Sequence, residues 1–253
     1  MIVRVGCCGW CVKGGKKEYF KEFSTIEVQE TFYKLPRVET VKKWREDAPV
    51  EFIFNMKAWQ VVTHPPGSPT WRRSGLKIPK SKVNSYGYLK PTQENIEAWN
   101  KILEVAEGLN AKVIVVQTPA SFNYSKENVK NIEEFFSIVE RCRCIIGWEP
   151  RGDWREHLSE VKRLCSKLDI LHITDPFRSE NVSDHLIGYF RLHGIGGREV
   201  NYSYRYTIDD LYKLLENIRR EREKGREEVY VMFNNVSMRD DAANFKKLLL
   251  KTL

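Results

Sequence analysis

One short run constrains the fold more than any other feature of the sequence. The stretch Ile145-Ile146-Gly147-Trp148-Glu149-Pro150-Arg151 begins apolar and ends in a carboxylate, a proline and a guanidinium. A continuous apolar run of this kind is typical of a strand that is buried on both faces, as in a parallel sheet. Proline stops the strand because it has no N–H to donate. The polar side chains are therefore expected at the C-terminal end of the strand.

The same pattern recurs along the chain. Four further runs begin apolar and end polar, namely 52–57, 113–117, 189–193 and 229–235. Their last residues include Lys57, Gln117, His193 and the pair Asn234-Asn235. Functional groups at the carboxyl ends of many parallel strands are characteristic of the active face of a (β/α)8 barrel.

The remaining segments complete an alternation of strands and helices. Strands are expected over 2–7, 25–31, 52–57, 112–118, 144–149, 169–175, 185–193 and 228–234, and helices over 18–23, 38–47, 92–107, 125–139, 153–168, 207–224 and 240–250. The link after the sixth strand is too short for a full helix. The length of 253 residues is close to the roughly 250 residues of one barrel. With no linker in evidence, we predict an α/β protein with a single TIM-barrel domain over residues 1–253.

The charge favours an anionic partner. The formal net charge is +8 and the pI is about 9.1, which suits nucleic acid, a phosphate or a carboxylate ligand. A generally basic, solvated surface would account for the same numbers. Charged residues make up 30% of the chain, and their concentration in Lys/Glu/Arg-rich helices suggests a thermophilic source.

The chain lacks the apolar segments that membrane proteins and secreted proteins carry. No run of about 18 apolar residues occurs, and the opening Met1-Ile2-Val3-Arg4-Val5 is too short for the apolar part of a signal peptide. We therefore expect no membrane partner and a cytoplasmic location. Six cysteines in a chain of this length do not indicate a disulfide framework.

A long connection, residues 64–90, follows the third expected strand. It is rich in proline and glycine, has several Lys and Arg side chains and contains no acidic residue. Long loops in compact domains are often lids or binding loops. Trp71, Tyr86 and Tyr88 are interleaved with the cations, and such aromatics can stack on bases while the cations meet phosphates. A disordered basic insertion is the alternative.

Six stretches, in order from end to end, resemble a known family. They are 28–36, 54–57 with Thr63-His64, 117–119, 148–151 with Trp154, 189–194 and 230–235. The set is similar to the YecE-like proteins, a family with a domain of unknown function numbered 72 in its series. This resemblance implies a TIM barrel and implies no reaction. The chain departs from the family in its opening loop, where Cys7, Cys8 and Cys11 replace hydroxyl residues.

Glu149 is the first candidate for catalysis. Beside the apolar residues that precede it, its pKa could rise enough for general acid or base work. The alternative is a carboxylate kept ionised by Arg151 or Arg191 as a structural pair.

Lys57, Arg191 and His193 form a cationic set at the ends of two strands. Arg191 and His193 lie two residues apart, so they share one face of their strand. With Lys57 they could hold a phosphate or carboxylate, the arginine as a bidentate fork. His193 could instead shuttle protons, or could be a buried histidine bonded to a backbone carbonyl. Lys57 could form a Schiff base if desolvated, although the sequence gives no direct sign of this.

Further polar residues are expected to position a hydroxylated or nucleotide-like ligand around the same face. They are Glu30, Tyr33, His64, Gln117, Arg151, Asp175, Asn234 and Asn235. Capping of strand ends by these residues is the alternative. A divalent metal held by Glu30, Glu149, Asp175 and His193 is also conceivable if these side chains converge.

Three cysteines at the end of the first strand are the unusual feature. Cys7, Cys8 and Cys11 could hold zinc or an iron–sulfur cluster, and Cys8 and Cys11 have the spacing of a redox pair. Small core hydrophobes are the alternative. Cys142 and Cys144 are expected at the opposite end of the barrel. The loop 194–197, rich in glycine, could donate N–H groups to a phosphate, or could be merely flexible.

Together these observations favour an enzyme that acts on an anionic, phosphate-containing substrate at the C-terminal face, by hydrolysis or isomerisation. A nucleic-acid-binding protein or nuclease that uses loop 64–90 is the first alternative. A cysteine-dependent metal or redox protein is the second.

Overall fold

Eight parallel strands close into a barrel in the computed structural model, which describes residues 1–252. The strands are β1 (Ile2–Cys8), β2 (Thr25–Val28), β3 (Ile53–Lys57), β4 (Ala111–Gln117), β5 (Ile145–Glu149), β6 (Leu171–Thr174), β7 (Ile187–Leu192) and β8 (Glu228–Phe233). β8 closes the ring on β1 with six residues in register, from Ile2 opposite Glu228 to Cys7 opposite Phe233. The predicted TIM barrel is confirmed.

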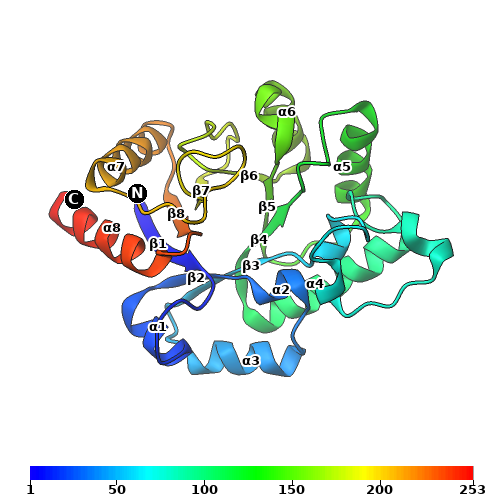
Figure 1. The fold of residues 1–253 in the computed structure, drawn as a ribbon, viewed down its shortest axis with the longest axis horizontal. Coiled ribbons are helices and arrows are strands. Elements are labelled where there is room, and N and C mark those ends of the chain that lie inside the picture. The colour runs from blue at the N-terminus through cyan, green and yellow to red at the C-terminus, as the bar shows by residue number, and fades with distance from the viewer. Residues whose placement is uncertain (253) are drawn as a thin grey trace.

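Helices surround the strands (Figure 1). They are α1 (Lys16–Glu22), α2 (Glu30–Tyr33), α3 (Val38–Asp47), α4 (Gln93–Leu109), α5 (Lys126–Ile138), α6 (Leu158–Leu168), α7 (Ile208–Glu223) and α8 (Met238–Thr252), with the 3-10 helices η1 (Gln60–Val62), η2 (Trp71–Ser74), η3 (Lys80–Ser85) and η4 (Gly152–Glu156). Among the residues described, β6 and β7 are joined without a helix, as expected from the short link.

Helix starts follow capping chemistry where the chain offers a suitable side chain. The Ser125 hydroxyl accepts a hydrogen bond from the N–H of Asn128 and caps α5. The helix expected over 153–168 does not start at its first residue, because the Asp153 carboxylate accepts from the N–H of Tyr124 and the chain there forms η4. The helix that follows, α6, begins only at Leu158.

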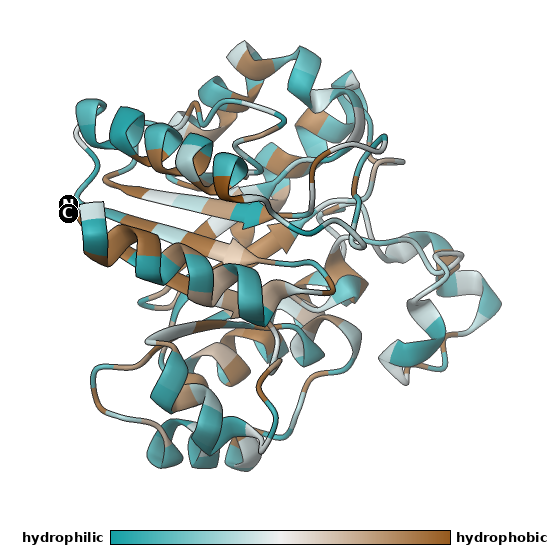
Figure 2. Cartoon of the chain, turned by 60° about the vertical axis from the view of Figure 1, so that its left-hand side comes forward, coloured by the Kyte–Doolittle hydropathy of each residue, from teal (hydrophilic) through white to brown (hydrophobic). Residues whose placement is uncertain are grey.

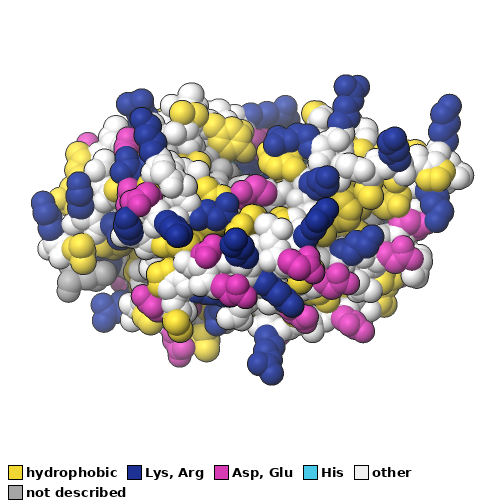
Figure 3. Space-filling view, turned by 90° about the horizontal axis from the view of Figure 1, so that it is seen from below, with side chains coloured by type: hydrophobic (Ala, Val, Ile, Leu, Met, Phe, Trp, Pro, Cys, Tyr) yellow, Lys and Arg dark blue, Asp and Glu magenta, His cyan; other side chains and the backbone are white. Residues whose placement is uncertain are grey.

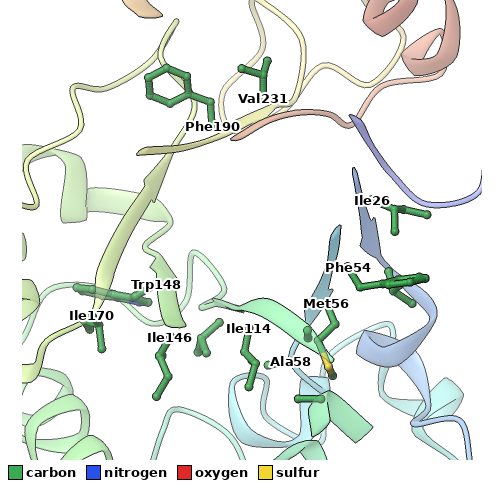
Figure 4. Packing of buried hydrophobic residues seen from close by; sticks show 14 of the residues in the cluster. Ile26, Phe54, Met56, Ala58, Ile114, Ile146, Trp148, Ile170, Phe190 and Val231 are labelled. Carbon is green, nitrogen blue, oxygen red and sulfur yellow. The ribbon is translucent and has the colours of Figure 1, made fainter. Parts of the chain in front are cut away.

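The main hydrophobic core lies between the barrel and the helices. Side chains that alternate along the strands, among them Ile26, Phe54 and Ile114, point outward from the ring (Figure 4). Figure 2 shows mainly hydrophobic strands enclosed by helices that carry both hydrophilic and hydrophobic residues. Both faces of each strand are thus covered, which explains the continuous apolar runs in the sequence.

A second, smaller apolar cluster fills the barrel itself. It includes Val113, Ile173, Tyr189 and Tyr230, and the rings of the two tyrosines stack at 5.5 Å. The barrel is therefore a packed core below its mouth. The polar residues that end the strands lie above this cluster, at the end opposite to the two termini (Figure 2).

Loop 64–90 is ordered and stands beside α4, outside the ring of strands (Figure 1). The carboxamide of Asn95 holds it by accepting from the N–H of Gly87 at 3.2 Å and donating to the Gly87 carbonyl at 3.1 Å. Trp71 is only 6% exposed and packs edge-on against Tyr86. The indole predicted to stack on bases therefore anchors the loop instead.

The cations of this loop remain on the surface. Arg72, Lys77 and Lys80 are exposed, whereas Lys82 pairs with Glu94 at 2.9 Å. One whole face of the molecule shows Lys and Arg side chains spread among carboxylates (Figure 3). No helix within residues 1–252 has both the length and the apolar character needed to cross a membrane.

Close approach of β1 and β2 depends on Gly6. A Cβ atom at this position would lie 2.3 Å from the carbonyl oxygen of Thr25, which belongs to the backbone of the neighbouring strand. We expect Gly6→Ala to lower the free energy of unfolding by about 1–3 kcal/mol through overpacking. Urea unfolding measures this. Gly67→Ala is the control, because a Cβ there meets nothing within 4 Å; equal midpoints for the two variants would contradict the prediction.

Candidate active site at the C-terminal mouth of the barrel

A buried arginine joins two carboxylates at the centre of the mouth. Arg191 Nε lies 3.0 Å from Glu27 Oε2, and Arg191 Nη2 lies 2.8 Å from Glu27 Oε1. Arg191 Nη1 donates to Glu149 Oε2. All three side chains are buried. The fork that the sequence suggested for an anionic ligand is therefore already filled by Glu27 and Glu149.

Glu27 was missed by the sequence analysis, which placed Glu30 at the strand tip instead. The expected strand 25–31 is wrong at its end, because β2 stops at Val28 and α2 begins at Glu30. Glu30 is exposed on that helix, whereas Glu27 is fully buried inside the barrel. The sequence did carry a signal for Glu27. Thr25 and Glu27 alternate with two apolar residues, which places them together on one face of the strand, and one face of each barrel strand points inward.

Glu149 is held in its ionised form. Its Oε1 lies 2.8 Å from Arg151 Nη2 and 3.0 Å from His193 Nε2. Burial alone would raise the pKa of this carboxyl, but the charges of Arg151 and Arg191 outweigh burial and hold the pKa well below its usual range. The raised pKa expected for a general acid is therefore corrected, and the alternative of an arginine-paired carboxylate describes the contacts.

His193 is a neutral ring fixed on both nitrogens. Asn234 Nδ2 lies 3.0 Å from His193 Nδ1, and His193 Nε2 lies 2.7 Å from Arg151 Nη2 and 3.0 Å from Glu149 Oε1. Burial, followed by the charge of Arg151, lowers the pKa of His193 to about 3. The backbone N–H of His193 donates to Asp175 Oδ2 at 3.0 Å, which joins the ends of β6 and β7.

The amine of Lys57 makes no ion pair with a carboxylate within residues 1–252. Glu149, by contrast, pairs with Arg151 and Arg191. Its Nζ lies 3.9 Å from the centroid of the Phe32 ring, and the residue is 8% exposed. Burial, followed by the charge of Arg191, lowers the pKa of Lys57 to about 7. The neighbouring His64 is neutral, because burial and then Lys57 lower its pKa to about 3.

Two arginines and a serine border a small cavity beside Glu149. The cavity has a volume of about 50 Å³ and lies among Arg151, Asp175, Arg178 and Ser179. Arg151 Nε, Arg178 Nε and Ser179 Oγ are buried and make no hydrogen bond within the described residues. Burial raises the pKa of Asp175 to about 6. The cavity is thus bounded by two arginines, of which Arg178 has its Nε 3.6 Å from Asp175 Oδ2, and by a carboxyl that titrates near neutrality.

The structure brings some of the other predicted ligand residues to the mouth and not others. Gln117 Oε1 lies 3.5 Å from Arg191 Nη1. Asn235 turns away, since its amide donates to Asp241 Oδ2 at 2.6 Å and to the Tyr204 carbonyl at 2.7 Å. Tyr33 also lies outside, with its ring 3.4 Å from the Arg73 guanidinium. The side chains of Asn235 and Tyr33 therefore serve loop contacts.

A tyrosine that the sequence analysis did not single out stands at the entrance. The Tyr202 ring lies 6.0 Å from the His193 ring and is 47% exposed. It follows the glycine-rich loop 194–197, whose carbonyls accept hydrogen bonds from Arg178: Nη2 lies 2.7 Å from the Gly194 oxygen and 2.5 Å from the Gly196 oxygen. The loop thus presents carbonyls to a cation, not N–H groups to a phosphate.

The cysteines of the first strand do not converge. Cys8 points into the barrel, where its Sγ lies 3.9 Å from Arg191 Nη2, while Cys7 points outward and its Sγ lies 3.4 Å from the Met238 carbonyl. Neighbouring strand residues face opposite sides, so the predicted three-thiolate site cannot form. Within residues 1–252 no group of three or more His, Cys, Asp or Glu side chains is placed to hold a metal ion.

The fold and these residues define a (β/α)8-barrel protein with a polar, charge-rich mouth. The chain belongs to the family described as "Protein of unknown function DUF72", whose model matches residues 4–253. The resemblance to the YecE-like proteins is thereby confirmed.

Relatives support this assignment over most of the chain. The UPF0759 protein YunF of Bacillus subtilis (strain 168) is 25% identical over 257 residues, which cover 91% of this chain and 84% of that protein. A crystal structure of a DUF72 family protein from Thermotoga maritima MSB8 has a TM-score of 0.70 at 22% identity, and the match covers 99% of this chain and 100% of that one.

A more distant likeness extends only to the fold. A crystal structure of D-psicose 3-epimerase in the presence of D-fructose has a TM-score of 0.55 at 12% identity, covering 92% of this chain and 90% of that one.

Loss of the central arginine should destabilise the barrel. We expect Arg191→Met to lower the free energy of unfolding by about 3–5 kcal/mol, because Glu27 and Glu149 would remain buried without their shared cation. Urea unfolding monitored by circular dichroism measures this. Arg155→Met is the control: its partly exposed pair with Glu199 at 3.3 Å should contribute about 1 kcal/mol or less. Similar losses in both variants would contradict the prediction.

Buried neutral histidines should make the protein sensitive to acid. The pKa of His64 and that of His193 are lowered to about 3, and that of His172 to about 4, from 6.5. In each case the unfolded chain binds a proton that the folded chain does not, so stability present above pH 6.5 is lost as the pH falls toward these lowered values. The pKa of Asp175 is raised, so in this pH range the folded chain binds a proton there that the unfolded chain does not. This partly offsets the loss of stability on acidification.

The contribution of one histidine can be isolated by comparing variants. Between pH 6 and 5, the unfolding free energy of His64→Gln should fall less steeply than that of the wild type, by up to about 1.4 kcal/mol per pH unit. Urea unfolding at several pH values measures both slopes. Parallel slopes would show that His64 is protonated equally in the folded and unfolded states.

Proposed function

We propose that this protein is an enzyme that isomerises a small, hydroxylated, anionic substrate by transferring a proton at the mouth of the barrel. The observation that carries the proposal is the amine of Lys57. It is buried at the C-terminal end of β3, it has no carboxylate partner within the described residues, and its pKa is lowered to about 7.

An amine with this pKa suits general acid–base catalysis. Near pH 7 both its protonated and its neutral form are populated, so it can take a proton from carbon and return it. Glu149 suits the role less, because two arginines hold it ionised and occupy its oxygens. Its role in this proposal is to fix His193 and Arg151. His193 in turn stays a neutral ring whose Nε2 contacts Glu149 and Arg151.

The charge of the mouth favours an anion. The mouth has four cationic side chains when Lys57 is protonated, namely Lys57, Arg151, Arg178 and Arg191. They face three carboxylates when Asp175 is ionised, namely Glu27, Glu149 and Asp175. The cavity of about 50 Å³ beside Arg151 is about three to five times the roughly 10–15 Å³ that one water needs. A phosphate or carboxylate group placed there would lie beside the side chains of Arg151, Arg178 and Ser179.

Isomerisation is favoured over hydrolysis by the same contacts. Hydrolysis requires a base that activates water or a carboxyl that protonates a leaving group. The closest carboxylate, Glu149, is saturated by Arg151, Arg191 and His193. The fold likeness to D-psicose 3-epimerase is compatible with proton transfer on a sugar, and at 12% identity it adds no residue roles.

Nucleic-acid binding by loop 64–90 stays a prediction with weaker support. The exposed cations Arg72, Lys77 and Lys80 could meet phosphates, but the buried Trp71 removes one of the three stacking rings on which that prediction rested.

Proton transfer can be tested by isotope exchange. The protein is incubated in D2O with a panel of phosphorylated and carboxylated aldoses and ketoses, and deuterium at carbon is followed by NMR. We expect exchange into at least one substrate, with a rate that rises as the pH passes through about 7 and Lys57 loses its proton. Lys57→Met should lower this rate by about 100-fold or more.

The control is Lys34→Met, which removes an exposed lysine and should leave exchange unchanged. Release of inorganic phosphate or of a split product without deuterium at carbon would indicate hydrolysis and contradict the proposal. Full exchange activity in Lys57→Met would remove Lys57 from the mechanism.

A further inference from the structure

A second cavity lies at the opposite end of the barrel, away from Lys57 and Glu149. Its volume is about 440 Å³, and it is lined by the starts of β3, β4 and β5, the segment before β3 and the end of α4. Cys142 and Cys144 both line it. The sequence analysis placed these two cysteines at this end, and neither the mouth nor the proposed function uses them.

The two cysteines of this cavity are in direct contact. The N–H of Cys144 donates to Cys142 Sγ at 3.2 Å. The chain bends at Arg143 and Cys144, which shortens the roughly 7 Å that two extended residues span toward the separation a disulfide needs. Both cysteines are free and partly exposed, so a small molecule in the cavity can reach them.

Hydrogen bonding prepares one of the two thiols for reaction. The neighbouring Cys144 thiol is the largest cause that lowers the pKa of Cys142, which falls to about 7. Burial opposes this shift, and the N–H of Cys144 adds to it. The contact with Cys142 in turn raises the pKa of Cys144. At neutral pH the pair therefore consists of a thiolate and a thiol. This division of roles is what dithiol exchange requires, with one sulfur attacking and the other resolving.

The charged side chains around the thiols are nearly balanced. The cavity is lined by the cations Arg45, Lys112 and Arg143 and by the carboxylates Glu51 and Glu107. The guanidinium of Arg45 is occupied by the carbonyls of Phe52 and Ala48. Lys112 and Arg143 are exposed at the rim, and Arg143 lies between the two cysteines in the chain.

We propose that Cys142 and Cys144 form a dithiol site that exchanges with small disulfides. The Cys142 thiolate attacks one sulfur of the disulfide; a mixed disulfide forms and one thiolate leaves. The Cys144 thiol then gives its proton to that released thiolate. Its own sulfur attacks the Cys142 sulfur, which closes the Cys142–Cys144 disulfide and expels the second thiolate. The dithiol is oxidised by two electrons, and the small disulfide is reduced to one thiol and one thiolate.

The expected reactivity follows from two opposing effects. At pH 7 a thiol with a pKa near 7 is about half ionised, against about 1% for a thiol at the ordinary value of 9.0, a gain of roughly 50-fold. The intrinsic nucleophilicity of a thiolate falls with its pKa, by roughly 6- to 10-fold over two units. The net advantage of Cys142 is therefore roughly 5- to 8-fold over an ordinary exposed thiol.

The test uses the full-length protein and dithiobis(nitrobenzoate), an aromatic disulfide with two carboxylates. We expect a fast phase that releases two thiolates per protein, and peptide mapping should find a Cys142–Cys144 disulfide. Cys142→Ser should lose this phase. Cys144→Ser should release one thiolate in the fast phase and keep a mixed disulfide on Cys142.

Two controls make the result specific. Cystamine, a dicationic disulfide, should also close the Cys142–Cys144 disulfide, because the exposed charges that line the cavity are balanced. Lys57→Met should leave the fast phase intact, so failure of the proposed isomerase and failure of this site remain distinguishable. A fast phase that survives in Cys142→Ser, or a mixed disulfide that maps to Cys11, would overturn the proposal.

Discussion

The shared ion pair of Arg191 with Glu27 and Glu149 is the interaction on which the mouth of this barrel depends. It joins β7 to β2 and β5 across the interior, with both charged groups of the Glu27 pair fully buried. A lone buried charge in such a place would cost several kcal/mol. The two carboxylates around the guanidinium compensate this cost of burying charge. The Tyr189 hydroxyl adds a hydrogen bond to Glu27 Oε2 at 3.0 Å.

This ion pair determines what the surrounding residues can do. Glu149 stays ionised because Arg151 and Arg191 face it, and His193 stays neutral because it is buried next to Arg151. Lys57 shares the same enclosed region without a carboxylate of its own among the residues described, so burial lowers its pKa toward neutrality. The charged side chains of Glu149, Arg151 and Arg191 thus keep one protonation state, whereas the amine of Lys57 can change its own. This difference is the basis of the proposed proton transfer.

The two ends of the barrel carry different chemistry. The C-terminal end gathers side chains from many strands, because each parallel strand delivers its last inward residue to one place. The N-terminal end brings together strand starts and the bend that holds Cys142 and Cys144. A thiol pair at that end is unusual for a face that commonly serves stability, and it lies far enough along the fold to act independently of the mouth.

The sequence by itself determined the architecture and the end of the barrel at which polar residues gather. Apolar runs that end in Lys57, Glu149 and His193 require strands buried on both faces, and eight such strands with intervening helices close into a barrel. The sequence did not reveal the role of Glu27, because a single carboxylate within a short strand is equally compatible with an exposed face. It also assigned Trp71 to base stacking, whereas the fold buries that indole.

Only the tertiary structure decided which charges compensate one another. Glu149 could be an acid with a raised pKa or an anion bound by arginine. Which of these it is depends on residues distant in sequence, such as Arg191, and local sequence spacing does not encode the distance between Arg191 and Glu149 in the fold. The same holds for Cys7 and Cys8, which are adjacent in the chain yet lie on opposite faces of one strand. Local patterns determine the elements, because hydrogen bonding and hydrophobic periodicity are local, whereas pKa values and partners arise from closure of the barrel.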